Sequence, residues 1–232
     1  MFNLNFKTAI LIWDIDGTLL TTNGSGIPAF VAAINKVANT NLKGFEKSRF
    51  AGRTDYEITE VLLEEEGYKD ISNVIFEEIL TEYAQNLKNI LNNKNTFQID
   101  GVGSKIEYLK SYFPEIKHYI GTGNFPHCAE IKLQASGLSS YFDPNDIYCS
   151  IDSGPRRGII SSAKRSAMKY SSNIVVIGDT IHDEEAAIAN NLPCLILESN
   201  YFKSSASNVK SNLIKAGWSL RELIVRLNGL FT

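Results

Sequence analysis

The chain has 232 residues, 44% of them apolar, and a formal charge of −3 at pH 7. This length is enough to bury a sizeable core, either in one domain with an insertion or in two small domains. The weak acidity and the lack of a basic run argue against a nucleic-acid partner, and no apolar run suits a membrane span or a signal peptide, so we expect a cytoplasmic protein.

The first predicted element is a short buried strand over residues 9–13, which are apolar and partly β-branched. Asp14 and Asp16 follow it, and in an extended backbone their side chains leave on the same face. Two such carboxylates repel each other unless a cation neutralises them or one takes up a proton. Gly17 would then let the backbone turn sharply. On its own, the stretch also fits an ordinary Asp-Gly turn.

Residues 21–96 predict helices, and we call them the helical insertion. A loop over residues 20–26, rich in Thr, Asn, Ser and Gly, precedes the first of these helices. Apolar residues at helical spacing predict helices over 28–39, 54–67 and 72–92, and Thr54 with Glu57 fits a capping box at the start of the second.

From about residue 100 onward, helices and strands alternate. Helices are predicted over 102–112, 126–137, 158–170, 184–190, 205–216 and 220–228, and strands over 118–120, 146–149, 174–177 and 194–197. This alternation predicts an α/β fold, a doubly wound parallel-sheet (Rossmann-like) core with helices on both faces. The expected division is a core of residues 1–20 and 97–232, with the all-helical domain at 21–96 inserted after the first strand.

Polar side chains follow each of the predicted central strands. They are Asp14 and Asp16, then Thr122, Gly123 and Asn124, then Arg156 and Arg157, and finally Asp179 and Asp183. In a doubly wound sheet these strand ends converge. Several carboxylates together suit Mg²⁺, and a hydroxyl, backbone N–H groups and an Arg suit a phosphoryl group. A carboxylate nucleophile beside a metal indicates phosphoryl transfer through an aspartyl-phosphate.

Three motifs carry a resemblance to a known family. The run Asp14-Ile15-Asp16-Gly17-Thr18 resembles the signature of the haloacid dehalogenase-like (HAD) hydrolase superfamily, Thr122 resembles its second motif, and Gly178-Asp179-Thr180-Ile181-His182-Asp183 resembles its fourth. The insertion between the first two motifs is similar to the helical cap of the phosphoglycolate-phosphatase-like branch. Ala51-Gly52-Arg53-Thr54-Asp55 resembles a cap loop that faces the substrate in those enzymes.

The resemblance implies a role for each aspartate. Asp14 would be the nucleophile and a metal ligand. Asp16 would bind the metal through its carbonyl oxygen, protonate the leaving alcohol and then activate water. Asp179 would bind Mg²⁺ directly, and Asp183 would act through water or by orienting a ligand.

The resemblance also implies a set of substrate contacts. Thr122 and the backbone N–H of Gly123 would hold the phosphoryl oxygens, and Gly17 lies in the same loop system. Asn124 is either a further contact or a helix cap. Arg53 is either a substrate contact or a solvated residue of the cap.

The third motif departs from the family pattern. The family usually has Lys there, often followed by Pro, whereas this chain has Gly154-Pro155-Arg156-Arg157-Gly158. Alignment of the helix that follows favours Arg156, with Arg157 as the alternative. An arginine is chemically adequate because it carries a fixed charge and five donors.

The predicted function is a Mg²⁺-dependent phosphatase for a small phosphorylated metabolite. The presence of Asp16 favours phosphate chemistry over carbon–halogen cleavage, and a phosphonatase would need a cap lysine such as Lys43 or Lys47 in a different context. A sugar-phosphate mutase or other phosphotransferase is an alternative, and so is a non-catalytic phospho-metabolite binding protein, which the change from Lys to Arg would favour. The protein would be a monomer or a homodimer.

The remaining reactive side chains have simpler interpretations. His182 is expected to pack at the pocket edge, while His118 and His127 have no partner at metal-ligand spacing and receive no role. The cysteines, which are Cys128, Cys149 and Cys194, lie far apart in apolar contexts and are expected to be buried reduced thiols.

Overall fold

A parallel sheet forms the centre of the larger part of the molecule. The computed structural model describes residues 4–69, 72–91, 95–150, 154–198 and 213–231. The sheet has six strands in the order β5-β4-β1-β6-β7-β8, and each neighbouring pair is parallel. The strands are β1 (Ala9–Trp13), β4 (Ile116–Gly121), β5 (Ile147–Tyr148), β6 (Ile174–Gly178), β7 (Cys194–Leu197) and β8 (Leu213–Ile214). The doubly wound sheet is therefore confirmed, with its switch in strand order at β1.

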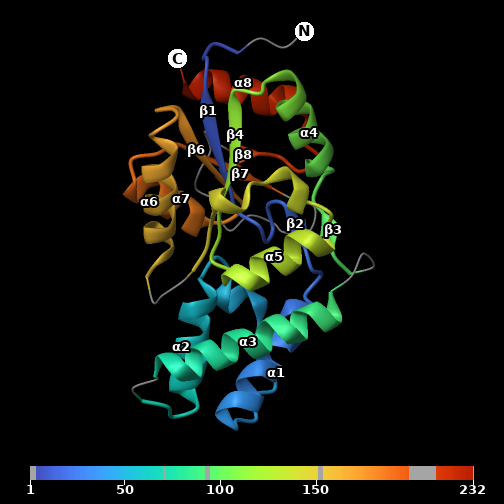
Figure 1. Cartoon of the computed structure of the whole chain (residues 1–232), viewed down its shortest axis with the longest axis vertical. Coiled ribbons are helices and arrows are strands. Elements are labelled where there is room, and N and C mark those ends of the chain that lie inside the picture. Colours follow the sequence, from blue (N-terminus) through green and yellow to red (C-terminus); the bar gives the residue numbers. More distant parts are fainter. Residues whose placement is uncertain (1–3, 70–71, 92–94, 151–153, 199–212, 232) are drawn as a thin grey trace.

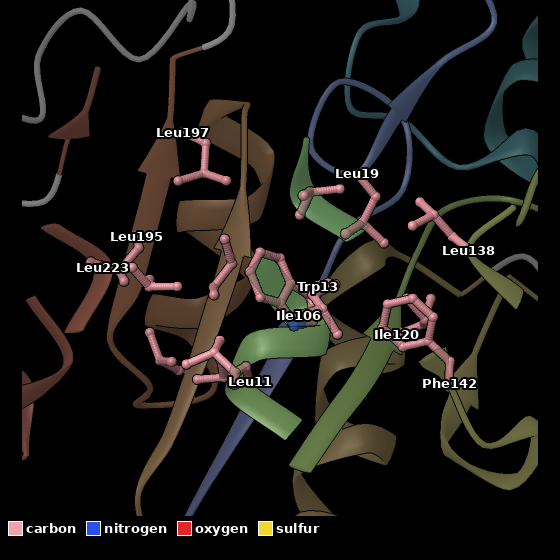
Figure 2. Packing of buried hydrophobic residues seen from close by; sticks show 14 of the residues in the cluster. Leu11, Trp13, Leu19, Ile106, Ile120, Leu138, Phe142, Leu195, Leu197 and Leu223 are labelled. Atoms are coloured by element: carbon pink, nitrogen blue, oxygen red, sulfur yellow. The ribbon is translucent and has the colours of Figure 1, made fainter. Parts of the chain in front are cut away.

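Helices cover both faces of this sheet. Because side chains alternate along a strand, Leu11 and Trp13 pack on one face with α4, α5 and α8 (Figure 2). Ile10 and Ile12 pack on the other face with α6 and α7, and Figure 1 shows where these helices lie. These helices are α4 (Val102–Tyr112), α5 (Pro126–Ala135), α6 (Arg156–Ala167), α7 (Ile181–Ala189) and α8 (Leu220–Leu230). Burial on two faces explains why β1 is a continuous apolar run rather than an alternating one.

The helical insertion forms a second group of helices with its own apolar cluster. It contains α1 (Gly26–Ala38), α2 (Asp55–Glu65), α3 (Asn73–Ile90) and a 3₁₀ turn over Lys47–Phe50. In Figure 1 these helices lie below the sheet, on the side where β1 and β4 end. A small antiparallel ribbon of β2 (Leu20–Thr21) and β3 (Phe97–Gln98) joins the two ends of the insertion. Phe125 and Cys128, from the start of α5, belong to the same cluster, so the boundary with the sheet core is shared.

Several predicted elements need correction. Most of the helix predicted over 205–216 lies outside the described residues, and its part at Leu213–Ile214 is wrong because those residues form β8. Helix α7 begins at Ile181 rather than at 184, because Thr180 and Asp183 form a capping box at its start. The strand predicted over 146–149 is limited to β5. The capping box at Thr54 and Glu57 is confirmed.

All three cysteines are free thiols, and Cys128 and Cys194 are buried while Cys149 is half-buried.

Among the described residues, every helix is either too short or too polar to cross a membrane.

Candidate active site

The carboxyl ends of β1, β4 and β6 meet at one edge of the sheet and open into a cavity. Asp14 directly follows β1, Thr122 follows β4 and Asp179 follows β6, and all three side chains are buried. The cavity has a volume of about 950 Å³ including its open mouth, and Asp16, Asn124 and residues of the helical insertion also line it. The convergence predicted from the sequence is thus present for these strand ends.

Three carboxylates lie together in the floor of this cavity. Asp14, Asp179 and Asp183 each place one oxygen so that all three oxygens lie within 4.8 Å of one another. Burial and the repulsion from Asp183 and Asp16 outweigh the effect of Arg156 and raise the pKa of Asp14 to about 7. Burial and the same kind of repulsion, from Asp183 and Asp14, raise the pKa of Asp179 as well. An all-oxygen, negatively charged set of this kind fits a hard divalent cation such as Mg²⁺.

Two glycines allow these carboxylates to approach the backbone. Gly17 has φ +89°, and a Cβ there would lie 2.1 Å from Asp179 Oδ2. A Cβ at Gly178 would lie 2.1 Å from the Cγ of Asp183. Any side chain at either position would push a carboxylate out of the floor, so the local sequence fits a site that keeps Asp179 and Asp183 in place. The Thr18 hydroxyl further holds Asp179, donating to Oδ1 at 3.4 Å.

Arg156 supplies the buried cation of the site. Its Nη2 lies 2.6 Å from Asp14 Oδ1 and 2.5 Å from Asp183 Oδ1. Burial opposes its charge, but the carboxylates of Asp14 and Asp183 prevail and raise the pKa of Arg156. Its Nε is buried without a hydrogen-bond partner, which leaves one N–H for a ligand. Arg157, in contrast, is exposed, and its carbonyl accepts a hydrogen bond from Asn190.

Asp16 belongs to a separate group of contacts beside the three-carboxylate cluster. Asn124 Nδ2 donates to Asp16 Oδ2 at 2.7 Å and to Thr122 Oγ1 at 2.8 Å. The helix-cap interpretation of Asn124 is therefore wrong: the N-cap of α5 is Phe125, which makes no side-chain capping bond. Asn124 instead links Asp16, at the end of β1, to the Thr122 hydroxyl, at the end of β4.

Lys132, which was not predicted as a site residue, completes this group. Its Nζ lies 2.7 Å from Asp16 Oδ2, and it also donates to Asn124 Oδ1. The side chain is buried, and although burial opposes the charge, Asp16 and Asp55 raise the pKa of Lys132. A signal was present in the sequence, because Lys132 follows Cys128 and Ala129 at helical spacing and so lies on the buried face of α5.

The loop between the 3₁₀ turn and α2 brings the helical insertion against the core. The Asp55 N–H donates to Gly123 O at 2.8 Å, the Phe125 N–H donates to Asp55 Oδ2 at 3.0 Å, and Arg156 Nη1 donates to Gly52 O at 3.4 Å. A Cβ at Gly52, which has φ +77°, would lie 2.5 Å from the His182 ring. Close contact at this loop therefore depends on glycine.

Three further side chains considered from the sequence, one arginine and two histidines, lie outside the carboxylate cluster. The Arg53 side chain is exposed, and its guanidinium lies 6.0 Å from the centre of the Phe50 ring at the cavity wall. His182 packs at Gly52 on the rim, with Nδ1 3.3 Å from Glu185, and lies outside the carboxylate cluster. His118 is buried behind the site, where its Nδ1 accepts a hydrogen bond from Trp13 Nε1 at 3.1 Å.

Comparisons with known proteins agree with this geometry. The family model described as haloacid dehalogenase-like hydrolase matches residues 11–197. None of the curated proteins matches the chain.

Solved structures share the fold at low sequence identity. A predicted phosphatase from Clostridium acetobutylicum has 20% identity and a TM-score of 0.67, with 98% of this chain and 100% of that chain covered. CbbY from Rhodobacter sphaeroides in complex with phosphate has 16% identity and a TM-score of 0.68, with 94% and 96% covered. A predicted phosphoglycolate phosphatase from Haemophilus somnus has 17% identity and a TM-score of 0.62, with 95% and 97% covered.

Proposed function

Because the chain belongs to the haloacid dehalogenase-like hydrolase family, we propose that it is a Mg²⁺-dependent phosphatase that hydrolyses a small phosphorylated metabolite through an aspartyl-phosphate. One observation carries this proposal: the Asp14 carboxylate, the Arg156 guanidinium and the Thr122 hydroxyl line a single cavity together with Asp179, and the buried Asp183 lies beside Asp14 and Asp179. The phosphatases among the structural neighbours, and the phosphate bound to CbbY, support the same chemistry.

The first step forms the covalent intermediate. A carboxylate oxygen of Asp14 attacks phosphorus, the bond from phosphorus to the alcohol oxygen breaks, and Asp16 gives that oxygen a proton. Arg156 offsets the negative charge of Asp14 and offers its unpaired Nε–H to the phosphoryl group. The Thr122 hydroxyl accepts two hydrogen bonds from Asn124, so its own proton is available for a phosphoryl oxygen.

The second step releases phosphate. Asp16 takes a proton from water, the water oxygen attacks phosphorus, and the bond to Asp14 breaks, which restores the Asp14 carboxylate. Mg²⁺ would be held by Asp14 and Asp179, and by Asp16 through its carbonyl oxygen, and when bound it would neutralise phosphoryl and carboxylate charge. Both Asp183 oxygens are engaged, one by Arg156 and the other by Thr180, which suits an orienting role.

We also propose that residues 1–20 and 97–232 act as the catalytic core and that the helical insertion acts as a cap. The apolar cluster of α1, α2 and α3, whose only buried members from the core among the described residues are Phe125 and Cys128, supports this division. The contacts of Gly52 and Asp55 with the core would hold the cap over the bound ester. Gly123 and Arg53 would contact the substrate where the two parts meet.

The test is phosphate release from a panel of phosphomonoesters by the purified protein with Mg²⁺. We expect turnover that Asp14→Asn and excess EDTA both abolish, and that Ca²⁺ inhibits because it accepts more ligands at longer distances. Asp143→Asn changes an exposed aspartate elsewhere and should leave the rate unchanged. Turnover by Asp14→Asn, or in excess EDTA, would refute the mechanism, and phosphate transfer to a second sugar instead of water would indicate the mutase.

A further inference from the structure

Most of the large side chains that the helical insertion contributes to the roof of the cavity are apolar, with Thr22, Arg53 and Asp55 as its polar residues. The floor is charged, whereas the roof contains four aromatic and two aliphatic residues: Ile27, Phe30, Phe45, Phe50, Ile58 and Tyr83. Such a wall contacts the part of a substrate that extends away from the phosphoryl group. Its chemistry therefore bears on the alcohol that the phosphate ester carries.

The aromatic rings of the roof form one continuous chain. Ring centres are 4.7 Å apart for Tyr83 and Phe30, 6.3 Å for Phe30 and Phe45, and 5.0 Å for Phe45 and Phe50. Edge-on contacts of this kind fix the rings as one surface. Phe30, Phe50 and Tyr83 are buried and Phe45 is half-buried, so the surface is anchored in the interior of the insertion.

Three of the polar groups that border the roof are paired inside the protein, whereas the exposed Arg53 guanidinium and the Thr22 hydroxyl also line the cavity. Asn124 and Lys132 both bind Asp16, and Asp55 accepts the Phe125 N–H. A hydroxyl-rich substrate would have to break these contacts or leave its hydroxyls unpaired against the rings, and each unpaired buried hydroxyl is costly. An apolar group has no such requirement.

We propose that the alcohol carried by the phosphate ester is predominantly apolar rather than a polyhydroxylated sugar. The ester's phosphoryl group would lie on the charged floor, and its apolar part would contact the chain of rings. This inference rests on the proposed phosphatase function and names its substrate class.

The first test compares two esters with matched leaving groups. Benzyl phosphate and glycerol 3-phosphate are both esters of primary alcohols, so their intrinsic reactivity is similar while one is apolar and the other hydroxylated. We expect kcat/KM for benzyl phosphate to exceed that for glycerol 3-phosphate by at least about 30-fold, in the range that apolar pocket contacts provide. Equal values, or a preference for glycerol 3-phosphate, would overturn the proposal.

A binding experiment separates this inference from the proposed function. Benzylphosphonate and methylphosphonate cannot be hydrolysed by this route, so calorimetry with Mg²⁺ measures the roof contact without turnover. We expect benzylphosphonate to bind at least about 10-fold more tightly. Tighter binding by a protein that hydrolyses no ester would refute the phosphatase and keep the apolar subsite, whereas equal affinity for the two phosphonates would overturn the subsite.

Matched variants locate the effect in the roof. Phe45→Ala removes one ring from the cavity wall, and Phe76→Ala removes an equal ring from the insertion at a place where it stacks on Tyr56 instead. The preference for benzyl phosphate should fall several-fold in Phe45→Ala, mainly through KM, and stay unchanged in Phe76→Ala. The same fall in both variants would mean that the rings only support the helices, against the proposal.

Discussion

The sheet core and the helical insertion face the same cavity with opposite chemistry. On the core side, Arg156 Nη2 lies 2.6 Å from Asp14 and 2.5 Å from Asp183, so one cation is held by two specific carboxylates. On the insertion side, neighbouring rings lie edge-on with their centres 4.7 to 6.3 Å apart, and their contacts involve neither hydrogen bonds nor ion pairs. A phosphoryl group is the same in every ester, so fixed charges suit the floor, whereas the alcohol differs between substrates and suits a surface defined by shape and polarity.

This difference predicts how the two regions respond to change. Directional contacts to a reacting group are lost completely when one atom is removed, and their loss appears in the rate. Apolar contacts weaken in proportion to the area lost, and their loss appears in binding or stability. Substitutions in the two regions should therefore differ in magnitude and in kind.

Apart from loss of the nucleophile Asp14, the largest effect is expected at Arg156. Arg156→Ala should lower kcat/KM by about 10³-fold, because a buried cation beside the nucleophile is lost. Arg156→Lys should recover much of the loss, since it restores a charge where the family usually has Lys. Arg157→Ala is the matched control and should change little, because that side chain is exposed.

The opposite pattern would be informative as well. If Arg157→Ala abolished activity and Arg156→Ala did not, the third-motif role would move by one residue. If neither variant lost activity while both stayed folded, neither arginine would bind the phosphoryl group, and the assignment of the phosphoryl site would be wrong.

A smaller but still kinetic effect is expected at Lys132. Lys132→Met removes the ammonium that holds Asp16 Oδ2, and it should lower kcat by roughly 10 to 100-fold, a part of the usual contribution of general acid–base groups. The loss should be greater for benzyl phosphate than for p-nitrophenyl phosphate, whose leaving group needs no proton. Lys105→Met removes a half-buried lysine that lies over the Trp218 ring, and it should leave both rates unchanged. Equal losses with the two esters would contradict an action through Asp16.

Lys132 also shows where sequence-based prediction reached its limit. Asp14, Thr122 and Asp179 could be predicted because each directly follows a strand that is readable from a local apolar run. Lys132 meets Asp16 across 116 residues of chain, and no local pattern reports that contact. Its buried position on α5 was readable from helical spacing, but its partner was not.

The roof and the last strand were less predictable for different reasons. Phe30 and Tyr83 lie at helical spacing within predicted helices of the insertion, but only the packed structure places them at the cavity wall, together with Phe45 from the loop that follows α1. The error at Leu213–Ile214 arose because a short apolar run fits a helix segment or a buried strand equally well.

A stability effect is expected from His118 in the core. Burial, with a smaller contribution from Lys110, lowers the pKa of His118 to about 3, while in the unfolded chain the imidazole takes up a proton near pH 6.5. The unfolded state thus binds more protons below pH 6.5, and the folded state loses stability as the pH falls. The reference is His118→Gln, whose side-chain oxygen can still accept the hydrogen bond from Trp13 Nε1. Between pH 7 and pH 5, the free energy of unfolding of the wild type should fall by about 2 kcal/mol more than that of this variant.

Urea unfolding of the metal-free protein at each pH measures this difference. His127→Gln is the control, because the His127 side chain stays exposed to solvent in the folded protein. If the free energy of unfolding changed equally with pH in the wild type and in His118→Gln, His118 would be protonated in the folded protein as well.

The smallest effect compares equivalent helix caps in the two regions. Thr54 Oγ1 accepts the Glu57 N–H at 3.1 Å at the start of α2, and Ser219 Oγ accepts the Glu222 N–H at 3.2 Å at the start of α8. Replacement of either residue by Ala should cost about 1 kcal/mol and lower Tm by roughly 2 to 4 °C. Thr54 also fixes the loop whose Asp55 N–H donates to Gly123 O, so only Thr54→Ala should raise KM, by a few-fold. Thermal unfolding and steady-state kinetics of both variants test this, and an equal rise in KM for Ser219→Ala would show that KM follows overall stability rather than the contact between the insertion and the core.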